Sequence, residues 1–310
     1  MRSSCVAVDK TKAWRRSRRR ILVLNLAVAA CGSAFAAPAR ADPMALWRIV
    51  HGACVPHVEA GLGPKPCERV ELEGGVDQGV AILKDLVGIA QMLAIPTRRI
   101  TGIEDPQMLA LNAPPVFAVA WSAKTLVEAR LGRALPREAV GLAINSKWAR
   151  SQEQLHVHVD CMAIPVVKAL AEYASALDGV WRAMTVPLHG QIYVARRVDS
   201  ADLVDVAPLK LLADGVEGAR GHMGAYSLAA VGATFDGKPG FILLADQFSL
   251  EGGGHPRTFR ITIARLPIRR HDLNWTHCGL RDKLKLWVCA AAPRQLVQAR
   301  NSARERIAGR

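Results

Sequence analysis

The stretch Gln154–Cys161, QLHVHVDC, decides how the middle of this chain folds, because polar and aliphatic residues alternate along it. A period of two predicts a β-strand, since successive side chains of a strand point to opposite faces of the sheet. The aliphatic residues of one face, which we expect to pack on the core, are Leu155, Val157 and Val159. The residues of the opposite face, about 6.5–7 Å apart along the strand, are His156, His158 and Asp160.

Three hypotheses account for this polar face. Buried ionisable groups need partners, so the first hypothesis is a half-exposed strand whose two histidines and aspartate meet solvent. The second is a Zn²⁺ site, because His-x-His on a strand presents two imidazoles to a metal and Asp160 can be a third ligand. The third is nucleophilic catalysis, because a neutral imidazole can attack a phosphoryl group at neutral pH. The motif alone favours the metal site and the nucleophile equally.

Polar residues upstream favour phosphate chemistry over a metal. Asn145 ends an apolar segment eleven residues before His156, and Ser151 and Gln152 lie just before the histidines. Amides and hydroxyls donate hydrogen bonds, which suits the non-bridging oxygens of a phosphate better than the coordination sphere of a metal. A metal site would more often have another His or Cys nearby.

The rest of the chain alternates between helical and strand patterns, which predicts an α+β fold around an antiparallel sheet. Helical spacing of apolar residues predicts helices over 44–54, 116–132, 164–177 and 202–216, the last interrupted or restarted at Pro208. Strands are expected over 74–86, 89–102, 139–146 and 190–198, with a hairpin over 226–246 whose turn is DGKPG.

Charge is concentrated at the two ends of the 310-residue chain, whose net charge is +14. Residues 1–20 contain eight Lys and Arg against one Asp, and residues 255–310 contain thirteen against three acids. Residues 21–254 contain twenty basic and twenty-three acidic residues, so a central domain over 42–254 is near neutral. No basic stripe is interleaved with aromatic residues, which argues against nucleic-acid binding. The basic tail over 255–310 is expected to be poorly ordered.

Residues 1–41 have the pattern of an export signal or N-terminal membrane anchor. The basic segment WRRSRRR precedes seventeen uncharged residues and the cleavage pattern Ala39-Arg40-Ala41. Residues 17–22 resemble a twin-arginine signal, residues 28–31 resemble a lipoprotein box, and the apolar run is at the short edge of what spans a bilayer. Each alternative puts the domain outside the cytoplasm and beside a membrane.

Export also bears on the cysteines, because disulfides persist in oxidising compartments. Cys54 and Cys67 flank a loop that is rich in Pro and Gly. We therefore expect a disulfide between these two residues.

The segments AINS and SQEQLHVHVD resemble the histidine-triad signature, in which an Asn-ended strand, a Gly/Ser-Gln pair and alternating histidines follow one another. More of the chain resembles one branch of that superfamily, the bacterial CDP-diacylglycerol pyrophosphatases. The matching segments include LWRIV, LKDLVGIAQMLAIPTRRITGIEDP, AVGLAINSKWARSQEQLHVHVDC, YVARRV and HMGAYSLAAV, in that order. The resemblance implies a histidine-triad-like antiparallel sheet with flanking helices, extended by a C-terminal α/β segment.

The resemblance also implies a reaction, the hydrolysis of CDP-diacylglycerol to CMP and phosphatidate on the periplasmic side of the bacterial inner membrane. The middle position of the triad, His158 here, would attack the cytidine-side phosphorus and form a CMP–histidine intermediate without a metal or another cofactor. His156 would orient His158 or contact phosphate.

Further site residues follow from the same resemblance. Asn145, Ser151 and Gln152 would bind phosphate oxygens, and the two amides could instead hold the second nitrogen of the nucleophile. Lys84 and Arg99, near the ends of the first two expected strands, are candidates to neutralise the diphosphate.

Two features depart from the family pattern. Many relatives have His or Gln where this chain has Asp160, and phosphatidate is a weakly basic leaving group, so a general acid matters less there. Asp160 could instead orient an imidazole. The tail over 255–310, with eleven Arg, has no counterpart in the family and resembles the translation of a shifted reading frame.

Two other functions stay open at this point, and the oligomeric state is undecided. One is a histidine-triad hydrolase or transferase with a soluble nucleotide substrate, which the export signal disfavours because soluble nucleotides are scarce outside the cytoplasm. The other is an exported zinc-binding protein that uses His156, His158 and Asp160.

Overall fold

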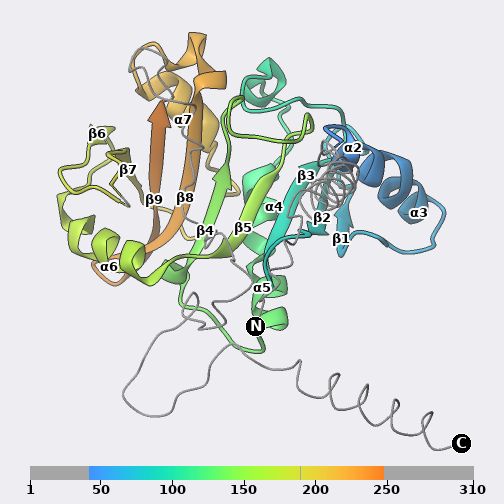
Figure 1. The fold of residues 1–310 in the computed structure, drawn as a ribbon, viewed down its shortest axis with the longest axis horizontal. Coiled ribbons are helices and arrows are strands. Elements are labelled where there is room, and N and C mark those ends of the chain that lie inside the picture. Colours follow the sequence, from blue (N-terminus) through green and yellow to red (C-terminus); the bar gives the residue numbers. More distant parts are fainter. Residues whose placement is uncertain (1–41, 189, 248–310) are drawn as a thin grey trace, which may run out of the picture. The chain divides into compact units, whose positions relative to one another are not determined.

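Nine strands form one sheet in the computed structural model, which describes residues 42–188 and 190–247. The strand order is β1-β2-β3-β5-β4-β8-β9-β7-β6, and neighbouring strands are antiparallel (Figure 1). The strands are β1 (Arg69–Glu71), β2 (Val80–Lys84), β3 (Met92–Pro96), β4 (Val140–Ile144), β5 (Val157–Cys161), β6 (Arg182–Ala183), β7 (Val194–Val198), β8 (Tyr226–Phe235) and β9 (Lys238–Gln247). The predicted α+β class with an antiparallel sheet is therefore confirmed.

Helices connect these strands and cover both faces of the sheet. The α-helices are α2 (Ala45–Ile49), α3 (Val55–Glu59), α4 (Val116–Ser122), α5 (Lys124–Leu131), α6 (Ile164–Tyr173) and α7 (Pro208–Gly215). A π-helical turn, η1 (Val50–Cys54), joins α2 to α3. The 3₁₀ turns are η2 (Pro106–Leu109), η3 (Arg137–Ala139), η4 (Ala174–Ala176), η5 (Ala219–Gly221) and η6 (Met223–Ala225).

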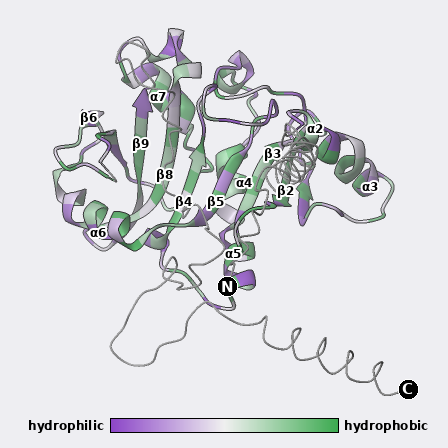
Figure 2. Cartoon of the chain, in the orientation of Figure 1, coloured by the Kyte–Doolittle hydropathy of each residue, from purple (hydrophilic) through white to green (hydrophobic). Residues whose placement is uncertain are grey.

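One face of the sheet is covered by a large apolar cluster, which we call the back cluster. Helices α4, α5 and α7 pack there against alternate residues of the strands, and Figure 1 shows α4 behind β3 and β5. Its buried sheet residues include Val80, Ile82, Met92, Ala94, Leu142, Val157, Val159, Leu228, Ala230 and Leu243. Figure 2 shows the matching pattern, with strands that are mostly hydrophobic and with helices such as α3 and α6 that mix both kinds of residue.

Two separate apolar clusters lie on the other face. The N-terminal cluster joins α2, η1 and α3 to β2 and β3 through residues such as Val50, Val55, Ala81, Leu93 and Ile95. The α6 cluster joins α6 to β4, β8 and β9 through residues such as Ala143, Val166, Leu170, Ala229 and Leu244. Strand β5 lies between β3 and β4, so it runs between these two clusters.

The predicted alternation of β5 is confirmed. Leu155, Val157 and Val159 are buried in the back cluster. On the opposite face, His158 is paired with Leu93 of β3 and with Ala143 of β4. The strand therefore places the polar residues of the QLHVHVDC motif between the N-terminal cluster and the α6 cluster.

Several sequence predictions are confirmed in their details. The predicted helix over 202–216 begins at Pro208, because proline fits the first turn of a helix and not its interior. The hairpin of β8 and β9 turns at Asp236 and Gly237, which both have positive φ angles, of 51° and 76°. Such angles suit the two-residue turns that join antiparallel strands.

Other elements differ from their expected bounds. The helix expected over 116–132 is interrupted at Ala123 between α4 and α5, although it ends at Gly132 as predicted. The N-terminal helical segment continues past Cys54 to Glu59. Residues 85–91, expected to belong partly to strands, form the loop between β2 and β3, because Lys84 Nζ binds the carbonyl oxygens of Asp85 and Gly88.

The predicted disulfide between Cys54 and Cys67 is confirmed, with a Cα–Cα distance of 5.7 Å. The expectations for residues 1–41 and for the tail lie outside the described residues. Within residues 42–188 and 190–247, no helix combines the length and the apolar character needed to cross a bilayer.

The disulfide closes a short loop that secures the N-terminal cluster. Because a cross-link of this kind restricts the unfolded chain, we predict that the double variant Cys54→Ser/Cys67→Ser loses about 2–4 kcal/mol of unfolding free energy. Urea denaturation of the full chain measures this loss. An unchanged midpoint would show that the disulfide does not stabilise the domain.

Candidate active site

The polar face of β5 is buried. His156, His158 and Asp160 have exposed fractions of 8%, 7% and 7%. The hypothesis of surface histidines on a half-exposed strand is therefore wrong, because β5 is paired on both sides and its polar side chains are almost completely removed from solvent. Buried polar groups of this kind need specific partners.

His158 is held at both ring nitrogens. Its Nδ1 lies 2.6 Å from Nε2 of Gln91 and 3.8 Å from Oδ2 of Asp85. The Gln91 amide also donates to Oδ2 of Asp85 at 2.8 Å, so the three groups form one connected set. On the other side of the ring, Nε2 of His158 lies 3.3 Å from Nδ2 of Asn145, at the end of β4. The predicted proximity of Asn145 and the histidines is confirmed.

His156 lies immediately before β5 and packs against His158. The two rings meet edge to face, with centroids 4.9 Å apart. Nδ1 of His156 is 2.8 Å from the carbonyl oxygen of Gln154. A carbonyl oxygen only accepts, so this nitrogen carries a proton and the neutral ring keeps its lone pair on Nε2. This contact fixes the tautomer of His156 beside the neighbouring imidazole.

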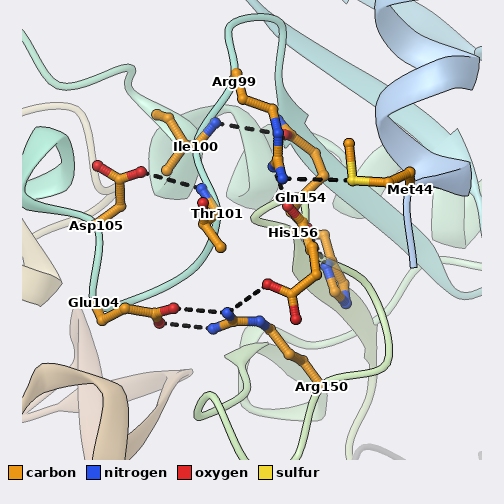
Figure 3. Close-up of polar contacts among 10 residues, drawn as sticks. Met44, Arg99, Ile100, Thr101, Glu104, Asp105, Arg150, Gln154 and His156 are labelled. Atoms are coloured by element: carbon orange, nitrogen blue, oxygen red, sulfur yellow. Dashed lines mark hydrogen bonds and ion pairs between the residues drawn. The ribbon is translucent and has the colours of Figure 1, made fainter.

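Gln154 anchors the start of this strand. Its side chain is completely buried and donates to the carbonyl oxygens of Pro96 and Arg98, each at 2.9 Å. Its Oε1 accepts from Arg99 at 3.0 Å (Figure 3). The residue therefore ties the end of β3 to the histidine strand.

Asp160 has a strongly perturbed carboxyl group. Burial raises its pKa to about 6, although the hydrogen bond from the Cys161 N–H and the positive charge of Lys84 oppose that rise. The Cys161 N–H donates to Oδ1 at 2.8 Å. A carboxyl group with such a pKa exchanges its proton near neutral pH, as an ordinary histidine does.

Lys84 lies at the end of β2, close enough to Asp160 for their charges to interact. Its Nζ donates to the carbonyl oxygens of Asp85 at 2.5 Å and Gly88 at 2.9 Å. Burial lowers the pKa of this ammonium group, and the nearby charge of Asp85 opposes that change. An ammonium group has three donors, so Lys84 can bind one further oxygen.

The other predicted phosphate ligands contact different parts of the chain. Gln152 bonds the backbone N–H of Leu46 and the carbonyl oxygen of Asp42, and therefore supports the N-terminal helical segment. Arg99 donates to the carbonyl oxygen of Glu153 and points towards Met44, as Figure 3 shows. Ser151 is exposed in the loop before β5. Their roles in phosphate binding stay predictions.

A partly buried group of three charged side chains holds the loop between β4 and β5. The guanidinium of Arg150 makes two hydrogen bonds of 2.6 Å with Glu104 and one of 2.9 Å with Glu153 (Figure 3). Two parallel bonds to one carboxylate restrict the guanidinium in both position and plane. This loop connects Asn145 to His156, so this group of charged side chains keeps the two ends of the site in place.

Asp85, Gln91 and Glu104 are residues of the site that sequence reasoning missed. Asp85 and Gln91 lie more than sixty positions before His158, and the antiparallel pairing of β3 with β5 brings them together. The sequence contained one indication of their role, namely that Asp85 and Gln91 lie at the two ends of a turn between expected strands.

The residues predicted as zinc ligands do not form a metal site in the part of the chain that the structure describes. Among residues 42–188 and 190–247, no three His, Cys, Asp or Glu side chains are grouped so that they could hold a metal ion. His158 and Asp160 instead have the polar partners described above.

Two imidazoles and a carboxyl group of raised pKa, on a central strand and just before it, are the residue types expected in the active site of a hydrolase. Comparison with known proteins identifies the family: the chain belongs to the CDP-diacylglycerol pyrophosphatase family, whose family model matches residues 41–259. A protein of Yersinia pestis named CDP-diacylglycerol pyrophosphatase is 38% identical over 206 residues, which cover 66% of this chain and 77% of that protein. The family resemblance inferred from the sequence is confirmed.

The raised pKa of the Asp160 carboxyl group predicts that the stability of the folded protein depends on pH. This pKa is about 6 in the folded protein and about 3.9 in an unfolded chain. The folded state therefore binds more protons between these values, and its stability falls as the pH rises from about 4 to 6. The Asp160→Asn variant has no carboxyl group to ionise at this position. The difference between its unfolding free energy and that of the unsubstituted protein should therefore increase by about 2–3 kcal/mol from pH 4 to pH 7.

Urea denaturation of both proteins at the two pH values measures this difference. Asparagine keeps the oxygen that accepts from the Cys161 N–H, so the comparison isolates the charge. A difference that is the same at pH 4 and pH 7 would mean that the carboxyl group titrates normally.

Proposed function

We propose that this CDP-diacylglycerol pyrophosphatase uses Nε2 of His158 to attack the cytidine-side phosphorus of its substrate. The products are CMP and phosphatidate. The observation that carries the proposal is the fixed orientation of His158, whose Nδ1 faces Gln91 and Asp85 while Nε2 faces Asn145. A nucleophile and an orienting acidic group in this relation are typical of covalent catalysis.

The proton of His158 decides which nitrogen can attack. An attacking Nε2 needs a lone pair, so the proton must be on Nδ1. The Asp85 carboxylate, 3.8 Å from Nδ1, favours that form. Gln91 donates to Oδ2 of Asp85 and so holds this carboxylate beside Nδ1, where it can accept the Nδ1–H once the Gln91 amide shifts away from the ring nitrogen. Gln91 and Asp85 therefore act as positioning residues.

The proposed reaction has two displacements at one phosphorus. First, the bond between Nε2 and phosphorus forms, and the bond from this phosphorus to the bridging oxygen breaks, which releases phosphatidate. The imidazole of the CMP–His158 intermediate is positively charged, and the partly buried Asp85 carboxylate stabilises that charge. Second, water attacks the same phosphorus, the bond to Nε2 breaks, and CMP is released with the oxygen of that water.

Asp160 is the proposed proton carrier. Its pKa of about 6 is close to the second pKa of a phosphate monoester, which is about 6. Proton transfer between groups of similar pKa is nearly balanced in energy, which suits a general acid and base. Asp160 can therefore protonate the departing phosphatidate and then accept a proton from the attacking water.

Two side chains beside His158 and Asp160 are proposed to donate hydrogen bonds to the phosphate oxygens. The Asn145 amide lies beside the attacking nitrogen, and Lys84 carries a positive charge beside Asp160. Donors fixed in a water-poor site stabilise charge that develops during displacement. His156, held by the Gln154 carbonyl, packs on His158 and limits rotation of its ring.

The likeness to histidine-triad proteins is part of the proposal. It is supported by the alternating histidines on a central antiparallel strand and by Asn145 at the neighbouring strand end. The family membership favours a lipid-linked substrate over a soluble nucleotide.

We also propose that the enzyme works on the periplasmic side of the bacterial inner membrane. The export-signal pattern of residues 1–41 and the lipid nature of the substrate support this location. Protease treatment of spheroplasts that carry the full chain tests it. Digestion is expected with intact spheroplasts, and protection until lysis would contradict a periplasmic site.

Removal of the nucleophile should nearly abolish turnover. We predict that His158→Ala lowers kcat by at least about 1,000-fold, because the variant has no group to form the intermediate. His156→Ala and Asp85→Asn should lower kcat by about 10- to 100-fold, with KM changed less, because each affects the orientation of His158. CMP release by the full chain is the measurement. Undiminished turnover by His158→Ala would refute the assigned nucleophile.

A further inference from the structure

The β2–β3 loop (residues 85–91) combines contacts to the nucleophile with an apolar tip. Its two end residues, Asp85 and Gln91, meet Nδ1 of His158. Between them, Leu86 is fully exposed, while Val87 and Ile89 have exposed fractions of 49% and 52%. Large apolar side chains gathered at an exposed loop tip beside an active site indicate an interaction surface.

Polar contacts of the loop are directed inward. Lys84 Nζ binds the carbonyl oxygens of Asp85 and Gly88, and the Val87 N–H donates to Oδ1 of Asp85 at 3.0 Å. The Asp85 N–H also donates to the Gln91 carbonyl oxygen at 3.1 Å across the base of the loop. These bonds occupy backbone groups that would otherwise need water, so the tip can leave water at a lower cost.

We propose that the tip formed by Leu86, Val87 and Ile89 enters the hydrocarbon region of the bilayer that carries the substrate. The inference rests on the proposed function, because CDP-diacylglycerol brings two acyl chains to the position where His158 meets its diphosphate. A loop that holds His158 at its base and is apolar at its tip matches a substrate with a charged head and apolar chains.

The size and place of the tip favour a bilayer over a protein partner. Three side chains offer less area than the about 800 Å² per partner that a stable protein interface usually buries. Apolar side chains that enter a lipid surface need no complementary shape, and they gain free energy in proportion to the area they remove from water. The bilayer is also the source of the substrate, so docking there shortens the path to His158.

A kinetic comparison of two substrates tests the proposal. The loop variant Leu86→Ser/Val87→Ser/Ile89→Ser is assayed in the full chain, with CDP-dioleoylglycerol in phosphatidylcholine vesicles and with CDP-glycerol in water. CDP-glycerol has the same diphosphate and no acyl chains. We expect kcat/KM to fall at least tenfold on the vesicles and to stay within twofold on CDP-glycerol.

A matched control removes three exposed apolar residues elsewhere, in the variant Leu62→Ser/Val180→Ser/Val204→Ser. It should stay within twofold of the unsubstituted protein on both substrates. Equal losses of the loop variant on both substrates, or no loss on vesicles, would overturn the proposal. Failure of the unsubstituted protein to release CMP from CDP-dioleoylglycerol would instead refute the proposed function.

A second measurement detects the contact itself without turnover. The full chain with Leu86→Trp is mixed with vesicles whose acyl chains carry bromine, which quenches nearby tryptophan, and the control is Leu62→Trp. The seven native tryptophans give both proteins the same background. Stronger quenching of Leu86→Trp supports insertion of the tip, and equal quenching of the two proteins, or oligomerisation that depends on the tip, would overturn it.

Discussion

The burial of ionisable side chains on a central strand is the constraint on which the rest of this domain depends. β5 is paired with β3 and β4, so its polar face cannot turn to open solvent. Burial of a charge without partners costs several kcal/mol. The structure meets that demand with the Gln91 amide and the Asp85 carboxylate at His158, and it leaves Asp160 with a raised pKa. The same desolvation that threatens stability therefore produces one carboxyl group, Asp160, that can exchange a proton near neutral pH.

The division of the sheet explains where this chemistry can occur. The back cluster extends across one face from β2 to β9, and it contains more buried apolar residues than the other two clusters together. On the other face, the N-terminal cluster and the α6 cluster stabilise the two sides of the sheet separately. The polar residues of β5 lie between them, and the β2–β3 loop supplies their partners. The chemistry is thus confined to the part of one face that lies between these two apolar clusters.

Much of this arrangement could be predicted from the sequence. The alternation of QLHVHVDC correctly assigned each residue of β5 to a face, because strand geometry depends on neighbouring residues alone. The family resemblance, the disulfide and the proximity of Asn145 to the histidines were also predictable from local patterns. The depth of burial was not, since it depends on which strands become the neighbours of β5.

The missed residues show why local patterns were insufficient. Asp85 and Gln91 reach His158 through the pairing of β3 with β5, which brings together segments that are distant in sequence. Lys84 was expected to face the diphosphate, yet two of its hydrogen bonds organise the β2–β3 loop. Arg99 and Gln152 also contact the N-terminal segment, which their sequence neighbours did not indicate, and their roles at the phosphate stay predictions. A side chain's partners follow from tertiary contacts, which its own neighbours in sequence do not specify.

The central claim is that His158 becomes covalently attached to CMP during turnover. The most direct test is a rapid quench of the full chain with CDP-diacylglycerol under alkaline conditions that preserve phosphoramidate bonds, followed by peptide mass spectrometry. The account predicts a mass increase that corresponds to CMP on the peptide that contains His158, and none in the His158→Ala variant. Normal turnover with no adduct at any time of quenching, or an adduct on His156, would contradict it.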